Sequence, residues 1–85
     1  MLLAIDAGNT NVVFAVFDAD KLRGQWRIST DPKRTADEYG VWLTQVMERA
    51  GITPSTITGA ILASVVPQGI FELRQLAKRY FNTEL

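Results

Sequence analysis

Apolar residues gather in four short runs, and each run predicts a β-strand. The runs at residues 2–5 and 12–17 contain no polar side chain, which is typical of strands covered on both faces. The run at residues 22–28 alternates instead, which predicts a half-buried strand at the edge of a sheet. One face of this strand should carry Leu22, Gly24, Trp26 and Ile28. The fourth run, residues 60–66, is again apolar on both faces apart from Ser64.

Two further segments repeat their apolar residues at the spacing of an α-helix. The first begins at Thr35, which forms the spacing of a capping box with Glu38, and ends at Gly51, which suits the position after a helix. The second covers about residues 68–81 and follows Pro67, a residue that can open a helix. The apolar stripes of the two helices consist of Tyr39, Trp42, Leu43, Val46, Met47 and Ala50, and of Ile70, Leu73, Leu76, Ala77, Tyr80 and Phe81.

The predicted order of elements is β-β-β-α-β-α, which defines an α/β domain with a mixed sheet and helices packed on it. Short turns join the first three strands into an antiparallel meander. The fourth strand follows a crossover helix, so it should lie parallel to the first. The chain stops at Leu85, directly after a helix. A βαβ unit would continue with another strand, so we expect the parallel side of the sheet to be truncated.

Composition narrows the classes of function. A chain of 85 residues makes one small domain, and its 9 basic and 9 acidic residues give a formal net charge of zero. This balance argues against binding of nucleic acid through a basic surface. The lack of cysteine and histidine excludes disulfides, thiolate metal sites and a histidine base. Because the N-terminus lacks a basic region and Asp6 interrupts the first apolar run, we expect neither a signal peptide nor a membrane span. The absence of cysteine fits a reducing cytoplasm.

The polar segment between the first two strands, Asp6–Asn11, carries the clearest candidate chemistry. Its sequence, Asp-Ala-Gly-Asn-Thr-Asn, predicts a tight hairpin. Gly8 would let the backbone approach an anion and adopt a positive φ, and successive backbone N–H groups of such a turn can bind phosphate. Phosphate would repel Asp6, so the natural role of Asp6 is to hold Mg²⁺ or its waters. Asp, Gly and Asn are also the commonest turn residues, so a hairpin without a ligand is the alternative.

The polar loop after the third strand has a simpler explanation than a role in a site. In one interpretation this loop faces a substrate through residues 29–31 and 33–34. A solvated connection that leads to a capped helix explains these residues better. Arg27 and Arg34 stay open as phosphate contacts, because nothing in their spacing singles either out.

Two other pairs of residues also have structural explanations. Trp26 and Trp42 fall on apolar faces, which favours the core over a binding platform. Asp37 and Glu38 suit the first turn of a helix, where carboxylates interact favourably with the helix dipole. A catalytic acid pair is therefore the weaker interpretation.

Four stretches occur together in the order and spacing of one enzyme family. They are Asp6–Asn11, Trp26–Asp31, Arg34–Tyr39 and Ser64–Pro67. With Asp-x-Gly in the first hairpin, the chain resembles the acetate and sugar kinase, Hsp70 and actin superfamily, and within it type III pantothenate kinase. The superfamily implies a duplicated ribonuclease-H-like lobe with nucleotide between the lobes. Residues 1–85 resemble the N-terminal nucleotide-binding lobe, incomplete because its final strand is missing, and the second lobe is absent.

The resemblance implies ATP-dependent phosphorylation of pantothenate to 4′-phosphopantothenate, the first step toward coenzyme A. It assigns the ATP site to Asp6, Ala7, Gly8, Asn9, Thr10, Asn11, Val12 and Val13. Asp6 would support Mg²⁺ on the phosphates, whereas Val12 and Val13 belong to the strand that closes the loop. Family members also need a monovalent cation, K⁺ or NH₄⁺, and are cytoplasmic homodimers, with no membrane or nucleic-acid partner expected.

Other functional parts of the family match no position in this chain. These parts are a pantothenate-contacting tyrosine, a Gly-x-Asp-Arg-type loop with the catalytic aspartate, and a cation-binding aspartate. We therefore expect the 85 residues alone to be inactive. One alternative is a non-catalytic accessory or transcription-related homologue, although the zero net charge disfavours direct contact with DNA. Another kinase or ATPase of the superfamily would not explain the matches at residues 34–39 and 64–67.

Overall fold

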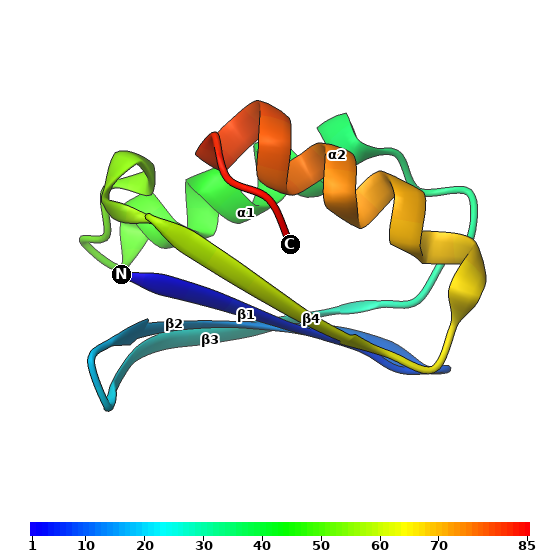
Figure 1. Ribbon diagram of the computed structural model, residues 1–85, viewed down its shortest axis with the longest axis horizontal. Coiled ribbons are helices and arrows are strands. Elements are labelled where there is room, and N and C mark those ends of the chain that lie inside the picture. The colour runs from blue at the N-terminus through cyan, green and yellow to red at the C-terminus, as the bar shows by residue number, and fades with distance from the viewer.

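The computed structural model describes residues 1–85, the whole chain, as one sheet with two helices on one of its faces (Figure 1). The elements are β1 (Leu2–Ala7), β2 (Asn11–Asp18), β3 (Lys21–Ser29), α1 (Ala36–Arg49), β4 (Gly59–Ser64) and α2 (Ile70–Phe81), with short 3₁₀ turns at Pro54–Thr56 and Pro67–Gly69. The predicted order β-β-β-α-β-α is confirmed. Neither helix has the length and apolarity needed to cross a membrane.

The strand order in the sheet is β3-β2-β1-β4. β1 pairs antiparallel with β2 and parallel with β4, and β2 pairs antiparallel with β3. The antiparallel meander, the parallel fourth strand and the edge position of β3 are therefore all confirmed. The carboxyl ends of β1 and β4 meet at one edge of the sheet, where Ala7 lies opposite Ser64.

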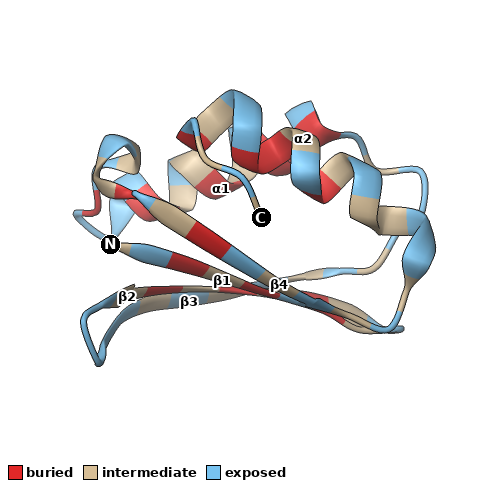
Figure 2. Cartoon of the chain, viewed as in Figure 1, coloured by how far each residue is buried: buried red, intermediate tan, exposed pale blue.

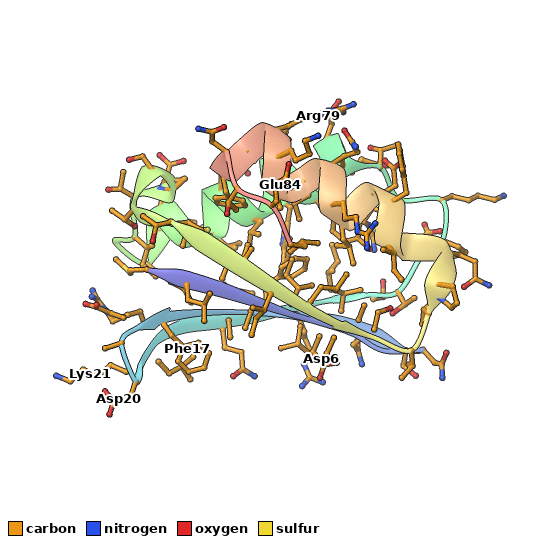
Figure 3. All side chains as sticks on the ribbon, in the orientation of Figure 1. Asp6, Phe17, Asp20, Lys21, Arg79 and Glu84 are labelled. Carbon is orange, nitrogen blue, oxygen red and sulfur yellow. The ribbon has the colours of Figure 1, made fainter.

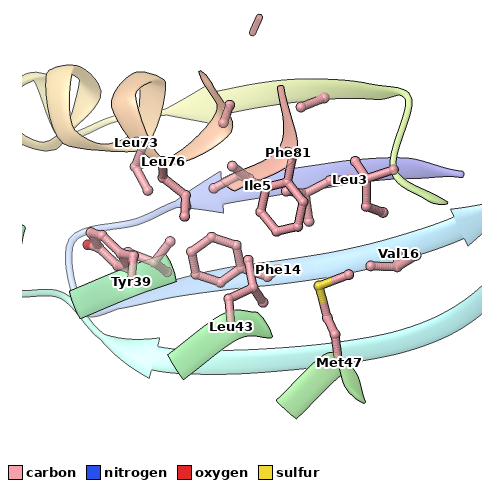
Figure 4. Close-up of a cluster of buried hydrophobic side chains, with 14 of the residues drawn as sticks. Leu3, Ile5, Phe14, Val16, Tyr39, Leu43, Met47, Leu73, Leu76 and Phe81 are labelled. Carbon is pink, nitrogen blue, oxygen red and sulfur yellow. The ribbon is translucent and has the colours of Figure 1, made fainter. Parts of the chain in front are cut away.

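The core fills the space between the helices and one face of the sheet (Figures 2 and 4). Alternate residues of β1 and β2, such as Leu3, Ile5 and Phe14, are buried there because successive side chains of a strand point to opposite faces. The helices contribute their predicted stripes except at Ala50, which follows α1 and is exposed. From α1 and α2 the fully covered side chains are Ala36, Leu43, Met47, Leu73, Leu76 and Ala77.

The expectation that the apolar strands are covered on both faces is wrong for this chain, because both helices lie on the same side. The opposite side, which we call the open face, shows Ile61 with 56% of its surface exposed, and Leu2 with 36%. Figure 3 shows Phe17 and Asp6 projecting to this side, away from the helices. The purely apolar runs thus reflect one buried face and one apolar face that no helix of this chain covers.

The predicted face of β3 is wrong at one position. The pairing of β2 with β3 shifts between Val16 and Phe17, so Gly24 lies opposite Val16 but Leu22 lies opposite Phe17. The extra residue, Arg23, forms a β-bulge, which reverses the alternation of side chains beyond it. Leu22 therefore shares the open face with Phe17 and is 52% exposed.

Both ends of α1 follow the sequence signals. Thr35 accepts a hydrogen bond from the backbone of Glu38, and the Glu38 carboxylate accepts one from the backbone of Thr35, which completes the capping box. Gly51 follows the helix with a φ of 78°, and Ile52 N donates to Met47 O at 2.9 Å. This arrangement satisfies carbonyls at the end of the helix.

β4 is shorter than predicted and α2 begins later. The Ser64 hydroxyl donates to Val66 O and accepts from Val66 N, both at 3.0 Å, so the chain turns at Ser64 instead of continuing as a strand. Pro67 then opens a 3₁₀ turn, and α2 starts at Ile70.

Candidate functional site

The candidate site is the hairpin between β1 and β2, at the edge of the sheet where the parallel strands end. β1 stops at Ala7 and β2 starts at Asn11, so a tight connection is confirmed. Gly8 N donates to Asn11 O at 2.9 Å and closes the hairpin. In open α/β sheets, ligands bind at the carboxyl ends of the parallel strands. The hairpin therefore lies where the fold class favours a ligand.

The positive φ predicted for Gly8 is wrong. Its φ is not positive, and neither is that of any other residue between Asp6 and Asn11. A Cβ atom on Gly8 would lie 3.2 Å from Asn11 O, closer than ordinary contacts. The glycine thus allows the two ends of the hairpin to approach each other.

Asp6 projects from the open face, with its carboxylate exposed to solvent (Figure 3). Its neighbours in the sheet are Val13 on β2 and Ala63 on β4. Its side chain forms no ion pair in the structure. A solvent-accessible carboxylate at the end of a central strand is free to accept bonds from magnesium-bound water.

A shallow hollow of about 270 Å³ lies beside Asp6 on the open face. Its lining comes from β1, β2 and β4 and consists of Ala4, Ile5, Asp6, Val13, Ala15, Ile61, Leu62 and Ala63. Small side chains at its centre leave the space open, and Asp6 is the only charged group in its lining.

The other predicted site residues fall into two groups, because successive side chains of a strand point to opposite faces of the sheet. Ala7 and Val12 are 4% and 2% exposed and belong to the core, so their side chains cannot touch a ligand. Val13 is half-buried on the side of Asp6, while Asn9 and Thr10 are exposed at the tip. The core residues anchor the hairpin, and its tip presents polar groups to solvent.

Backbone donors at the tip remain available. The N–H groups of Asn9 and Thr10 donate no hydrogen bond to the rest of the backbone. Free N–H groups on adjacent residues are the donors that phosphate-binding turns use. The backbone of the hairpin therefore fits a phosphate group, and the exposed Asp6 carboxylate fits the associated Mg²⁺.

The protein offers a metal ion few ligands of its own. No three acidic side chains come together as a cluster that could hold a metal. Mg²⁺ commonly binds through one or two carboxylates together with phosphate oxygens and waters. Asp6 thus suits a magnesium ion that arrives with a nucleotide, rather than a permanently bound metal.

The structure distinguishes Arg27 from Arg34, the two arginines that the sequence left open as phosphate contacts. Arg34 donates from its guanidinium to Ser29 O and lies over the ring of Tyr39, 5.6 Å from its centroid. Arg27 lies opposite Val13 and therefore in the same cross-strand row as Asp6, and it forms no ion pair. Arg34 is thus used within the fold, whereas Arg27 is on the side of the candidate site.

The two tryptophans and the acidic pair have the structural roles expected of them. Trp42 meets Phe14 edge-on, with ring centroids 5.6 Å apart, and Trp26 packs against the core. Hydrogen bonds from the backbone and hydroxyl of Thr35 lower the pKa of Glu38. Asp37 accepts a hydrogen bond from the Tyr80 hydroxyl, which raises the pKa of Tyr80. Both carboxylates are therefore engaged within the helical layer.

Thr30 belongs to residues 29–31, for which the sequence favoured a solvated connection over a substrate-facing loop, but the structure joins it to the hairpin. Its hydroxyl donates to Gly8 O and its backbone N–H donates to Thr10 O, each at 2.8 Å. The sequence showed only a polar loop after an alternating strand, and such loops are usually solvated. The contact joins residues 22 positions apart, so only the pairing of β2 with β3 brings it about.

The chain as a whole matches the family model described as "Type III pantothenate kinase" over residues 2–85. The four-stranded mixed sheet and the order of elements are those of the α/β fold that the resemblance implies. The chain belongs to the type III pantothenate kinase family.

Similar proteins agree with this assignment. The type III pantothenate kinase of Paramagnetospirillum magneticum is 61% identical over 84 residues, which is 99% of this chain and 32% of that protein. The type III pantothenate kinase of Rhodospirillum rubrum is 57% identical over 83 residues, 98% of this chain and 32% of its own length. That of Acidiphilium cryptum is 55% identical over 84 residues, with coverages of 99% and 32%. The chain thus spans about a third of the length of these relatives.

Proposed function

We propose that residues 1–85 form one wall of the ATP site of a type III pantothenate kinase. The whole protein would transfer the γ-phosphoryl group of ATP to pantothenate, giving 4′-phosphopantothenate, the first step toward coenzyme A. The observation that carries the proposal is the Asp6–Asn11 hairpin. In a chain of this family it combines an exposed carboxylate with free backbone donors at the carboxyl end of β1.

The residues of the hairpin have separate roles in this proposal. The N–H groups of Asn9 and Thr10 donate to phosphate oxygens, and the amide and hydroxyl side chains at the tip add further donors. Asp6 orients Mg²⁺ through its waters or directly. When bound with ATP, Mg²⁺ neutralises charge that develops on the phosphates. Ala7 and Val12 hold the hairpin through their burial in the core.

The remaining parts of the reaction fall to residues outside this chain. We propose that pantothenate, a monovalent cation such as K⁺ or NH₄⁺, and the catalytic base are bound elsewhere in a cytoplasmic homodimer. The carboxylates of α1 already serve as a helix cap and a tyrosine partner. In this proposal residues 1–85 supply binding and positioning, and the base for the pantothenate hydroxyl lies elsewhere.

An assay of ATP-dependent phosphorylation of pantothenate tests the proposal. The protein at its full natural length should give 4′-phosphopantothenate with Mg²⁺ and K⁺ or NH₄⁺ present, and the isolated 85 residues should give none. Absence of turnover by the full-length protein under these conditions would favour the accessory homologue instead. Turnover by the 85 residues at the rate of the full-length protein would contradict the proposal that the catalytic base and the pantothenate site lie outside them.

A further inference from the structure

We propose that Thr30 is a positioning residue that keeps the backbone N–H groups of the Asp6–Asn11 hairpin free for phosphate. The inference rests on the proposed function and adds a residue to it. Thr30 itself touches no ligand in this proposal, because its hydroxyl and its N–H are both directed at carbonyls of the hairpin.

The two bonds from Thr30 fix two peptide groups of the hairpin. Thr30 Oγ1 donates to Gly8 O, and Thr30 N donates to Thr10 O, each at 2.8 Å. The C=O of one residue and the N–H of the next belong to the same planar trans peptide and point in opposite directions. The chain has no cis peptide bond. The N–H groups of Asn9 and Asn11 are therefore directed away from Thr30.

Thr30 also occupies an acceptor that the hairpin would otherwise use. In an antiparallel pair of this kind, two facing residues exchange both of their N–H···O bonds. Here Gly8 N donates to Asn11 O at 2.9 Å, but the reciprocal bond from Asn11 N to Gly8 O is not formed. The Gly8 carbonyl accepts the Thr30 hydroxyl instead. Thr30 thus holds the hairpin in a form that leaves the Asn11 N–H unused at this pair.

The position of Thr30 is itself well defined. It is half-buried directly after β3, where Ser29 lies opposite Asn11. The turn that follows is closed by Arg34 N donating to Asp31 O at 3.0 Å and by Lys33 N donating to Asp31 Oδ1 at 2.9 Å. A fixed strand on one side and a closed turn on the other make Thr30 a rigid support for the hairpin.

Binding of Mg-ATP to Thr30→Val, Thr30→Ser and Thr44→Val in the full-length protein tests the proposal by calorimetry. Valine keeps the shape of threonine and removes the hydroxyl, so Thr30→Val should bind Mg-ATP about five- to tenfold more weakly, the effect of one lost hydrogen bond. Thr30→Ser keeps the hydroxyl and should bind like the wild type. The control Thr44→Val loses a hydroxyl bond to Gly40 O within α1 and should also bind like the wild type. Equal binding by Thr30→Val and wild type would overturn the inference.

Amide hydrogen exchange measures the protection of individual hairpin amides, which would not change if Thr30 contributed only to overall stability. In the free wild type, the Gly8 amide should be protected and the Asn9, Thr10 and Asn11 amides should exchange rapidly, whereas Mg-ATP should protect these three amides. In Thr30→Val, Asn11 should gain protection because its N–H can close onto Gly8 O. A protected Asn11 in the free wild type would overturn the inference even if Thr30→Val failed to fold.

The outcomes also separate this inference from the proposed function. Failure of the wild type to bind Mg-ATP would overturn both. Binding that is weakened by Asp6→Asn but unchanged by Thr30→Val would overturn only the role of Thr30.

Discussion

At the residue scale, the hairpin leaves backbone N–H groups unbonded at its tip. The pleat of β1 points Ile5 and Ala7 into the core and Asp6 to the open face, so one strand both anchors the hairpin and presents its carboxylate. Gly8 permits the close approach of its backbone to Asn11 O. The donors that remain are backbone N–H groups at the tip. Substitutions that keep the backbone in place should therefore be tolerated better at Asn9 than at Gly8.

At the residue scale, a substitution of Gly40 tests how closely α1 and α2 pack. A Cβ atom at Gly40 would collide with the ring of Tyr80, whose hydroxyl is bonded to Asp37 at 2.9 Å. We expect Gly40→Ala to lower the free energy of unfolding by about 1–2 kcal/mol, since overpacking exceeds the gain in helix propensity. Urea denaturation measures this change.

Gly69 provides the matched control. No atom lies within 4 Å of a Cβ built on Gly69, and its φ of −90° suits alanine. Gly69→Ala should leave the free energy of unfolding unchanged or raise it by up to about 1 kcal/mol. Equal destabilisation by both substitutions would show that the Tyr80 contact does not limit the packing.

The capping box is the clearest feature at the scale of elements. Thr35 satisfies a backbone N–H at the start of α1, and its replacement leaves that donor without a partner. We expect Thr35→Ala to cost about 1 kcal/mol of stability, measured by urea denaturation. Thr53 precedes the first 3₁₀ turn without any capping bond from its side chain, so Thr53→Ala should have almost no effect. A cost as large for Thr53 would contradict the role of the capping box.

The same box predicts a dependence on pH. Hydrogen bonds from Thr35 lower the pKa of Glu38 from its ordinary 4.5, so the folded state binds a proton at Glu38 less readily than the unfolded state. The stabilisation by Glu38 is therefore complete above the unfolded pKa and is lost as the pH falls through the folded pKa. Glutamine can also complete a capping box but does not titrate.

Urea denaturation of Glu38→Gln and wild type from about pH 6 to about pH 3 measures this dependence. The free energy of unfolding of the wild type should fall relative to Glu38→Gln as the pH decreases. A constant difference between the two proteins would contradict the capping interaction of the carboxylate.

Local sequence patterns predicted the helices and strands. They did not predict the contacts between these elements. The helix of α1 was predictable because Thr35, Glu38 and Gly51 act on their own helix. The bulge at Arg23 was not, since it depends on how β2 and β3 pair, and it moved Leu22 to the open face. The hydrogen bonds from Thr30 to the hairpin could not be predicted for the same reason. Apolar runs showed that a strand is apolar on both faces, but not which face the helices cover.

The two faces of the sheet divide the molecule at the largest scale. The helices pack on one face, while the open face carries Asp6 and Arg27 near the hairpin and Leu2, Phe17 and Leu22 toward the opposite end. The hairpin lies where the polar part of the open face meets the carboxyl ends of β1 and β4. The position of the hairpin could be predicted from the sequence, but its unbonded N–H groups and its hydrogen bonds to Thr30 depend on the pairing of the sheet.

Titration of the full-length protein with Mg-ATP tests the assignment of the hairpin most directly, with Asp6→Asn and the control Asp20→Asn. Asp20 is an exposed carboxylate in the turn between β2 and β3, at the opposite end of the sheet (Figure 3). Asp6→Asn should bind Mg-ATP at least about tenfold more weakly, since interactions with a charged group contribute about 1.5–3 kcal/mol. Asp20→Asn should bind like the wild type. Without Mg²⁺ the loss at Asp6→Asn should disappear, because the free carboxylate repels phosphate. Equal Mg-ATP affinity for Asp6→Asn and wild type would contradict the assignment of this hairpin to the ATP site.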